Sequence, residues 1–523
     1  MSVADPHLML AFEGTEVPQW LRQRLEESPP AGVSLFREWN MTSPGQVAEL
    51  TSALQAANSS PLPLLIAVDQ EGGQLIGLTG STEFAGNMAI GATGNVALAS
   101  EVAVAMGTEL AAVGINVNYA PVADVASRAL NPSLGIRSFG DDPKQVAQLT
   151  GAMVTGFNEA GVLATLKHFP GSGEAEVDPH FELPLLGLER DRLEQVELPP
   201  FRAGVAAGAE LLMVAHQVVP ALTGNSQVSI CASEIGINGF VRSELGFDRV
   251  VISDALDMGA LDQGPAQVVE IIAMMRAGTD LLLCMPDREL QDRARLALER
   301  GHARGMITDD TLNTAIARVK RARSSIRRME IRPEVVGSPN HLLLAKRLAE
   351  ESISLVRNDD SLIPLQSEHG RRILALEPEP VNVTPADTTA LYSPQLAAAL
   401  RSRHAAVTEI VYPHRPERSD ISVVVEKADE HDLIILGTVT VTPGQVDLAS
   451  ALLELGRPLI TVALRTPFDL ASYPGSKTHV CTYSSHRPSL DALTSALFGD
   501  ISFQGHLPAA IAGLYPRGHG IET

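Results

Sequence analysis

Short apolar runs of strand length alternate with longer amphipathic segments from His7 to Arg304. Apolar runs bounded by polar and turn residues predict buried strands, and apolar residues that recur at helical spacing predict helices. We predict strands at 7–12, 32–37, 64–69, 116–124, 163–169, 211–219, 249–254 and 280–285. We predict helices at 44–57, 95–113, 144–160, 193–208, 233–245, 266–277 and 288–304.

The number and order of these elements predict the fold of the first part of the chain. Eight strand–helix units within about 300 residues match a TIM (β/α)8 barrel in number and size. A doubly wound open sheet has the same local pattern and is the alternative. The count of eight favours the barrel.

A change of composition suggests where the barrel ends. A basic run covers 320–334, and Gly337-Ser338-Pro339 follows it. The remaining chain alternates again, with strands expected at 372–376, 409–412, 432–437, 458–464 and 479–483 and a helix at 445–455. We therefore predict a catalytic barrel over 1–330, a linker over 331–346, and a smaller α/β sandwich domain with a largely parallel sheet over 347–523.

Composition excludes several classes of partner. The formal net charge of −22 and the pI near 5.1 argue against binding to nucleic acid or to anionic membrane. The N-terminal segment has no basic stretch followed by a long apolar run, and the three cysteines show no metal-ligand spacing. The chain has no phosphate-binding loop and no HExxH motif, so we expect neither a nucleotide nor a metal, and no cofactor. A cytoplasmic protein is expected, and no oligomeric state is predicted.

Polar side chains stand at or near the ends of five successive predicted strands: Asp69, Asp124, Lys167 with His168, His216, and Asp254. Barrel enzymes display their working groups at this end of the strands. A tight Pro-Gly turn follows His168, and the next loop carries Asp178 two residues before His180. An aspartate beside a histidine can fix its tautomer and support its protonated form. The alternative is an ordinary surface turn with polar residues.

Several sequence blocks, in order, resemble glycoside hydrolase family 3. They are Ala-Val-Asp-Gln-Glu-Gly-Gly at 67–73, the segment 114–124, Ile-Arg-Ser-Phe-Gly at 136–140, Lys-His-Phe-Pro-Gly at 167–171 with the Asp178–His180 loop, and 251–258. Blocks at 352–358, 363–365, 497–499 and 505–508 extend the resemblance into the second domain. The Asp178–His180 loop is similar to that of the β-N-acetylglucosaminidase (β-N-acetylhexosaminidase) branch, in its two-domain form.

The resemblance implies a retaining, exo-acting glycosidase for a small carbohydrate substrate, such as terminal β-linked N-acetylglucosamine of cell-wall or chitin fragments. Asp254 is then the nucleophile, with Asp257 as its rival, and His180 is the proton donor oriented by Asp178. The sugar-binding residues implied are Asp69, Arg137, Lys167, His168, Asp124 and His216. Asp124 could equally be a cap on its loop, and His216 a satisfied core histidine.

Four positions depart from the family pattern. Gln74 and Gly77 stand where the family usually has arginines, and Ser172 and Pro179 replace the usual residues of two loops. Three other functions therefore stay open: a β-glucosidase, a glycoside phosphorylase, and a sugar-binding protein that has lost catalysis.

Overall fold

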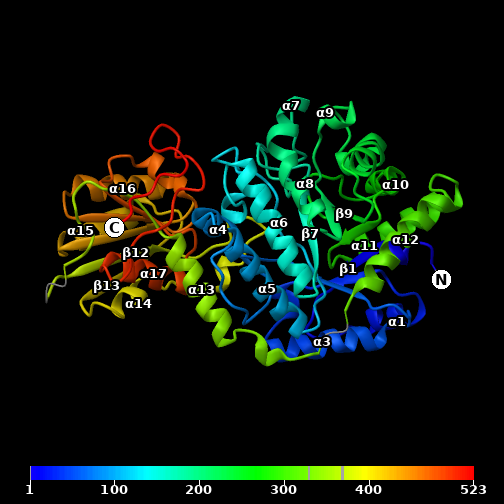
Figure 1. Ribbon diagram of the computed structural model, residues 1–523, viewed down its shortest axis with the longest axis horizontal. Helices are drawn as coiled ribbons and strands as arrows, with labels where there is room; N and C mark the ends of the chain where they lie inside the picture. Colours follow the sequence, from blue (N-terminus) through cyan, green and yellow to red (C-terminus); the bar gives the residue numbers. More distant parts are fainter. Residues whose placement is uncertain (1, 328–329, 367–369) are drawn as a thin grey trace.

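The computed structural model describes residues 2–327, 330–366 and 370–523. Two bodies lie side by side (Figure 1), a barrel wrapped by helices and a smaller sheet domain, and helix α13 (Pro339–Ser352) lies between them. The N-terminus is at the far end of the barrel, and the C-terminus lies on the sheet domain.

Eight parallel strands close the barrel in the part of the chain that the structure describes, in the order β1-β10-β9-β8-β7-β6-β3-β2. The predicted barrel is confirmed, and the open sheet is excluded. The strands are β1 (Leu8–Ala11), β2 (Gly32–Ser34), β3 (Leu65–Val68), β6 (Val117–Asn118), β7 (Leu163–Phe169), β8 (Leu211–Val214), β9 (Val250–Ala255) and β10 (Leu281–Cys284). After β3, the strands β4 (Gln70–Gly72) and β5 (Leu75–Ile76) form a small antiparallel pair.

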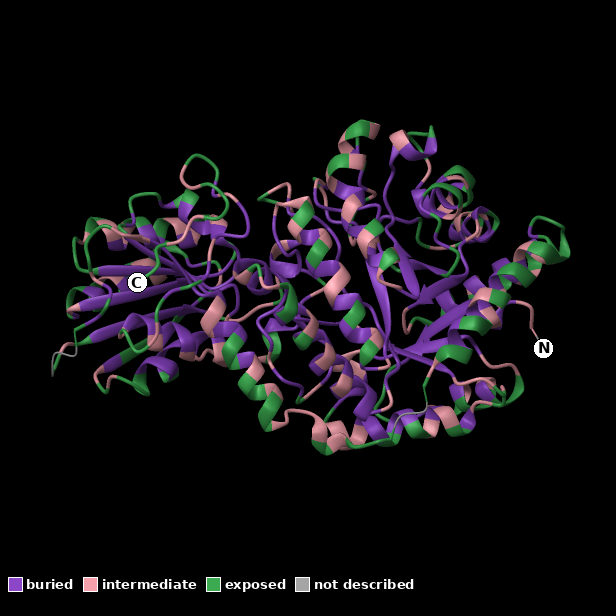
Figure 2. Cartoon of the chain, viewed as in Figure 1, coloured by how far each residue is buried: buried purple, intermediate pink, exposed green. Residues whose placement is uncertain are grey.

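The barrel strands are buried along almost their whole length. Every residue of β1, β3, β8 and β10 is buried. Side chains of a barrel strand point alternately into the barrel interior and against the outer helices, so both faces must be apolar. Figure 2 shows this arrangement, with buried strands inside and helices whose outer faces are exposed. The continuous apolar runs in the sequence are the direct consequence.

Local capping explains why several helices begin where the sequence predicts. The side chains of Ser43, Asn95 and Asp142 accept hydrogen bonds from the first backbone N–H groups of their helices. The barrel helices are α1 (Gln19–Glu27), α3 (Pro44–Ala57), α5 (Val96–Ala112), α6 (Pro143–Glu159), α8 (Leu198–Ala206), α10 (Gln267–Ala277), α11 (Arg288–Ala303) and α12 (Asp309–Ser325). Shorter helices are α2 (Arg37–Asn40), α4 (Asn87–Thr93), α7 (Arg190–Arg192) and α9 (Pro220–Thr223), and Leu193–Glu197 and Ile235–Glu244 are π-helical.

Two predicted strands are too long. The strand expected over 116–124 is continuous only at Val117–Asn118, and further along Val122 forms an isolated bridge with Lys167 of β7. Between the two, Pro121 lacks the N–H group that a barrel ladder needs. The strand expected over 211–219 ends at Val214, where the backbone turns and the Gln217 N–H donates to the carbonyl of Ala215. In both places the chain leaves the barrel early and supplies loop residues near the strand ends.

The second domain contains a six-stranded sheet in the described residues, in the order β11-β16-β15-β14-β12-β13. Its strands are parallel except β11, which pairs antiparallel with β16, so the largely parallel sheet is confirmed. The strands are β11 (Ser354–Asn358), β12 (Ile373–Pro378), β13 (Val407–Tyr412), β14 (Leu433–Thr438), β15 (Leu459–Ala463) and β16 (Thr478–Cys481). The helices are α14 (Leu396–Arg401), α15 (Arg418–Asp429), α16 (Pro443–Glu454) and α17 (Arg487–Leu497).

The division into 1–330, 331–346 and 347–523 remains a proposal. Helix α13 begins inside the proposed linker and continues into the second domain. It packs against α4 and α5 of the barrel and against α17 of the second domain. The segment that joins the two bodies is therefore an ordered helix in contact with both.

Candidate active site

A cavity of about 710 Å³ opens at the carboxyl ends of the barrel strands. Its volume falls within the range of about 300–1,000 Å³ that is typical of sites for small ligands. Its lining includes most of the residues predicted from the sequence: Asp69, Asp124, Arg137, Lys167, His168, His180 and Asp254. Residues at the ends of the predicted strands therefore gather around one cavity.

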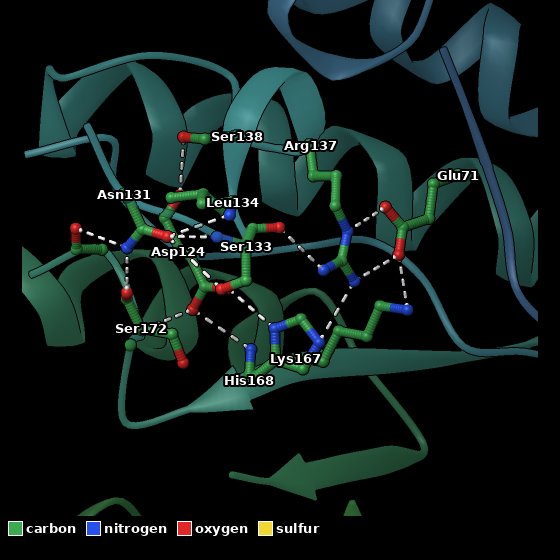
Figure 3. A network of polar contacts seen from close by, with 12 residues as sticks. Glu71, Asp124, Asn131, Ser133, Leu134, Arg137, Ser138, Lys167, His168 and Ser172 are labelled. Carbon is green, nitrogen blue, oxygen red and sulfur yellow. Dashed lines mark hydrogen bonds and ion pairs between the residues drawn. The ribbon is translucent and has the colours of Figure 1, made fainter. Parts of the chain in front are cut away.

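A buried cluster of charges forms one side of the cavity (Figure 3). Arg137 donates from Nε and Nη2 to the two carboxylate oxygens of Glu71, each at 2.9 Å. Lys167 Nζ lies 2.6 Å from a Glu71 oxygen and 2.6 Å from Asp69 Oδ1. Burial would raise the pKa of Glu71, but the positive charges of Arg137 and Lys167 outweigh it and hold that pKa at about 2. Glu71 is therefore ionised at neutral pH.

Glu71 has no predicted role in the sequence analysis. Its side chain is 2% exposed, and it accepts from both cations that the sequence assigns to sugar binding. Glu71 therefore positions Arg137 and Lys167. The signal available in the sequence was a glutamate followed by two glycines after an apolar strand, which does not identify its partners.

Asp124 fixes the orientation of His168. One Asp124 oxygen lies 2.8 Å from His168 Nδ1, and the other accepts from the backbone N–H groups of His168 at 3.2 Å and Ser172 at 2.9 Å. On its other side, His168 Nε2 lies 3.3 Å from Arg137 Nη2. Because arginine only donates, Nε2 accepts there and the ring carries its proton on Nδ1. Asp124 thus caps its loop and also sets the tautomer of a residue in the cavity wall.

Asp254 is the last but one residue of strand β9 and lines the cavity. Its Oδ1 accepts the N–H of Ala255 at 2.9 Å, which holds the carboxylate in place. Burial would raise the pKa of Asp254, but the imidazoles of His168, His216 and His180, when protonated, outweigh it and lower that pKa. Asp257 also lines the cavity, but it is exposed in the turn after the strand. The geometry favours Asp254 as the fixed anion.

Asp178 holds His180 in one orientation. Its Oδ1 lies 2.6 Å from His180 Nδ1 and accepts the His180 backbone N–H at 3.0 Å. Burial would raise the pKa of Asp178, but these hydrogen bonds from His180 outweigh it and lower that pKa. Since Nδ1 is engaged, Nε2 is the nitrogen left for a ligand.

The loop of His180 is tied to the turn that follows Asp254. The N–H of Gly259 donates to the carbonyl of His180 at 2.9 Å, and the N–H of Ala260 donates to that of Pro179 at 3.1 Å. A Cβ at Gly259 would lie 2.7 Å from the carbonyl oxygen of Phe181, so only glycine fits there. Backbone hydrogen bonds therefore link the two loops that position Asp254 and His180.

His216 is held behind the site. It is fully buried, with Nδ1 3.2 Å from Cys231 Sγ and Nε2 3.1 Å from the carbonyl oxygen of Ala255. Burial lowers the pKa of His216, which favours the neutral ring. Substrate contact by His216 stays a prediction, and its bond to Ala255 favours a role in positioning Asp254.

The second domain reaches the cavity, which sequence analysis did not predict. Its segment 382–388 lines the cavity wall. The Thr388 N–H donates to the Gln74 carbonyl at 2.8 Å, and Gln74 Nε2 donates to the carbonyl of Ala386 at 3.1 Å. Arg465 pairs with Asp387 at 2.7 Å and also donates to Gln74 Oε1. Gln74, a departure from the family pattern, thus connects the two domains.

The described residues include no group of three or more His, Cys, Asp or Glu side chains arranged to hold a metal ion. In the same residues, every helix is too short or too polar to cross a membrane.

Comparisons with known proteins agree with the fold. Residues 13–322 match the family described as "Glycosyl hydrolase family 3 N terminal domain". A beta-hexosaminidase A of Pseudoalteromonas piscicida is 31% identical over 95% of this chain and 92% of its own length. A beta-hexosaminidase of Stenotrophomonas maltophilia is 37% identical over 56% of this chain and 87% of its own length. The solved structure of a glycoside hydrolase family 3 beta-N-acetylglucosaminidase from Paenibacillus sp. superposes with a TM-score of 0.90 at 32% identity, over 97% of this chain and 98% of that chain.

The barrel, the cavity at its strand ends and these relatives together define a glycoside hydrolase. The chain belongs to glycosyl hydrolase family 3.

The ionised state of Glu71 should make stability depend on pH. The folded pKa of about 2 lies below the ordinary value of 4.5, so the carboxylate stabilises the folded state above pH 4.5. That contribution is lost as pH falls from 4.5 towards 2. Glu71→Gln removes the carboxylate partner of Arg137 and one of the two carboxylate partners of Lys167, so it should lower the free energy of unfolding at pH 7 by about 3–5 kcal/mol. The difference in free energy of unfolding between Glu71→Gln and wild type should become smaller below pH 4.5. Urea unfolding at a series of pH values measures this difference.

Glu176→Gln is the matched control, because Glu176 pairs with Arg128 on the surface. It should change stability by less than about 1 kcal/mol. Two results would contradict the role of the ionised Glu71 carboxylate in stability. One is a loss of unfolding free energy in Glu71→Gln as small as in the control. The other is a loss that stays constant down to the lowest pH at which the protein folds.

Proposed function

We propose that the protein is a retaining, exo-acting β-N-acetylglucosaminidase. It would release terminal β-linked N-acetylglucosamine, or a related hexosamine, from cell-wall or chitin-type fragments. The observation that carries the proposal is the presence of Asp254 and the Asp178–His180 pair on one cavity. The beta-hexosaminidase and beta-N-acetylglucosaminidase relatives supply the substrate class.

The proposed mechanism uses the two groups in succession. Asp254 attacks C1 of the sugar while His180 gives its Nε2 proton to the leaving oxygen, so that the glycosidic bond breaks and a sugar–Asp254 ester forms. Water then attacks C1, His180 takes the water's proton, and the ester bond breaks to restore the Asp254 carboxylate. Asp178 stays ionised and keeps the imidazole turned in the same direction throughout.

The charged cluster is proposed to bind the sugar hydroxyl groups. Asp69 can accept from hydroxyl groups, and Lys167, Arg137 and His168 can reach them from the same wall of the cavity. Their mutual contacts hold these side chains in place before the sugar arrives, which lowers the entropy cost of binding. The second-domain segment 382–388 adds a further wall, as expected for a pocket that takes one terminal sugar.

A cytoplasmic location and a role in cell-wall recycling remain part of the proposal. Its support is that Cys231, Cys284 and Cys481 are free and buried, as in proteins of reducing compartments. Cell fractionation with an activity assay tests it, and activity confined to the medium or an envelope fraction would contradict it.

The function is tested with an aryl N-acetyl-β-glucosaminide, with and without phosphate. We expect free N-acetylglucosamine as product in both cases. Asp254→Ala should lower kcat/KM by about 10³-fold or more, because the nucleophile is lost. Asp257→Ala is the matched control and should retain activity within about tenfold of wild type.

Each alternative function predicts a different result in this assay. Sugar 1-phosphate as the product would identify a phosphorylase, and turnover of β-glucosides alone would identify a β-glucosidase. Calorimetric sugar binding without any turnover would identify a binding protein. Full activity of Asp254→Ala together with an inactive Asp257→Ala would reassign the nucleophile.

A further inference from the structure

The order of the strands determines which residues face each other across the cavity. Strand β9, which carries Asp254, and strand β3, which Asp69 follows, lie four strands apart in the eight-stranded barrel and so face each other across its mouth. Strand β2 is the neighbour of β3. A pyranose whose C1 lies at Asp254, with the ring directed towards Asp69, points C4 at this far side, because C1 and C4 are opposite atoms of the ring. The polar groups near β2 and β3 therefore meet the distal end of the sugar.

Arg37, which follows β2, is an available cation at this end. It lines the cavity. Its Nη1 donates to the hydroxyl of Tyr392 at 2.7 Å and to the carbonyl of Ile76 at 3.3 Å, and its guanidinium carbon lies 4.9 Å from the centre of the Tyr392 ring. Among the described residues, Arg37 makes no ion pair within 4.0 Å, and Nη1 is the only nitrogen of its guanidinium that they engage. The second domain thus holds Arg37 while Nε and Nη2 stay free to donate.

Thr384 is an unsatisfied polar group of the same cavity. The residue is 8% exposed and lines the cavity, and its buried hydroxyl has no hydrogen-bond partner among the described residues. Buried hydroxyl groups in native proteins nearly always have a partner, so this one calls for a ligand group. Its segment is fixed, because Asp387 accepts the Val383 N–H at 3.1 Å and pairs with Arg465.

The backbone at Gly77 explains why Arg37 and Thr384, and not a side chain at position 77, supply the polar groups at this end of the cavity. A Cβ at Gly77 would lie 2.3 Å from the carbonyl oxygen of Asp69 and 2.6 Å from a methyl group of Val68. The backbone after β5 therefore cannot carry a side chain towards the cavity at this position. Segment 382–388 is bonded to the neighbouring Gln74 and Ile76, so it occupies the space beside Gly77.

We propose that Arg37 and Thr384 bind the hydroxyl groups at the C4 end of the terminal sugar, so that the second domain takes part in substrate selection. The inference rests on the proposed function. Arg37 would donate to the 4-hydroxyl, and the Thr384 hydroxyl would bond to a neighbouring oxygen of the same sugar. The pair thereby favours an equatorial 4-hydroxyl, as in N-acetylglucosamine, over its 4-epimer. A site that hydrogen-bonds a hydroxyl group discriminates strongly against analogues that misplace it.

The test compares aryl N-acetyl-β-glucosaminide with its 4-epimer, aryl N-acetyl-β-galactosaminide. Arg37→Met should lower kcat/KM for the glucosaminide by about 10–100-fold, and Thr384→Val by about 3–10-fold. Both should change kcat/KM for the galactosaminide by less than about threefold, so the preference for the gluco configuration falls. Arg37→Lys should show an intermediate loss, since it keeps the charge but loses the planar fork. Tyr392→Phe should act in the same direction, because it removes only the group that positions Arg37.

Arg22→Met is the matched control, because Arg22 is exposed on α1 and is not among the cavity-lining residues. It should leave both substrates unchanged, and thermal unfolding checks that every variant is folded. Equal losses on both epimers, or no loss on either in folded Arg37→Met and Thr384→Val, overturn the inference alone. A wild-type protein that hydrolyses neither substrate overturns it together with the proposed function.

Discussion

The site depends on the pairing of three buried charged side chains, Glu71, Arg137 and Lys167, to which Asp69 adds the second negative charge. A single charge at such a depth would be strongly destabilising, but the carboxylate accepts from both cations. The three residues come from β4, the turn at Gly135–Arg137 and β7. Their contact therefore draws three separate segments together at the carboxyl ends of the strands.

The other polar residues take their positions from this cluster. Lys167 holds Asp69, and Arg137 contacts the ring of His168, which Asp124 holds from the other side. Each of these side chains thus has a partner before any sugar is present, as preorganised sites require. The proposed nucleophile, Asp254, and the proposed proton donor, His180, lie at the other side of this arrangement, and backbone hydrogen bonds at Gly259 and Ala260 join their loops.

Much of the barrel and part of the candidate site could be predicted from the sequence, because they depend on interactions between residues close together in the chain. Barrel strands are buried on both faces and therefore read as apolar runs, and the caps at Ser43, Asn95 and Asp142 mark helix starts. Candidate residues such as Asp69 and Asp254 could be found because they end such runs.

What could not be predicted depends on contacts between distant segments. Arg465 and Gln74 are 391 residues apart and meet only because the second domain packs on the barrel. The same packing brings Thr384 to the cavity and places Tyr392 against Arg37, and nothing in the local sequence marks Thr384. Arg37 ends the strand predicted over 32–37, but its contact with the second domain could not be read from that position. The role of Glu71 was missed for a related reason, since its partners come from other elements. The edge strand β11, which pairs with β16 from the far end of the domain, was missed as well.

The most direct test of the account concerns its proton donor, which is a histidine held by an aspartate in place of a second carboxylate. The measurement is kcat/KM of His180→Ala over a series of aryl N-acetyl-β-glucosaminides whose leaving groups differ in acidity. The account predicts near wild-type values for the most acidic leaving groups and losses that grow to about 10²–10⁴-fold for the least acidic. His302→Ala, outside the cavity, should leave the whole series unchanged. A uniform loss across all leaving groups in His180→Ala would contradict the account.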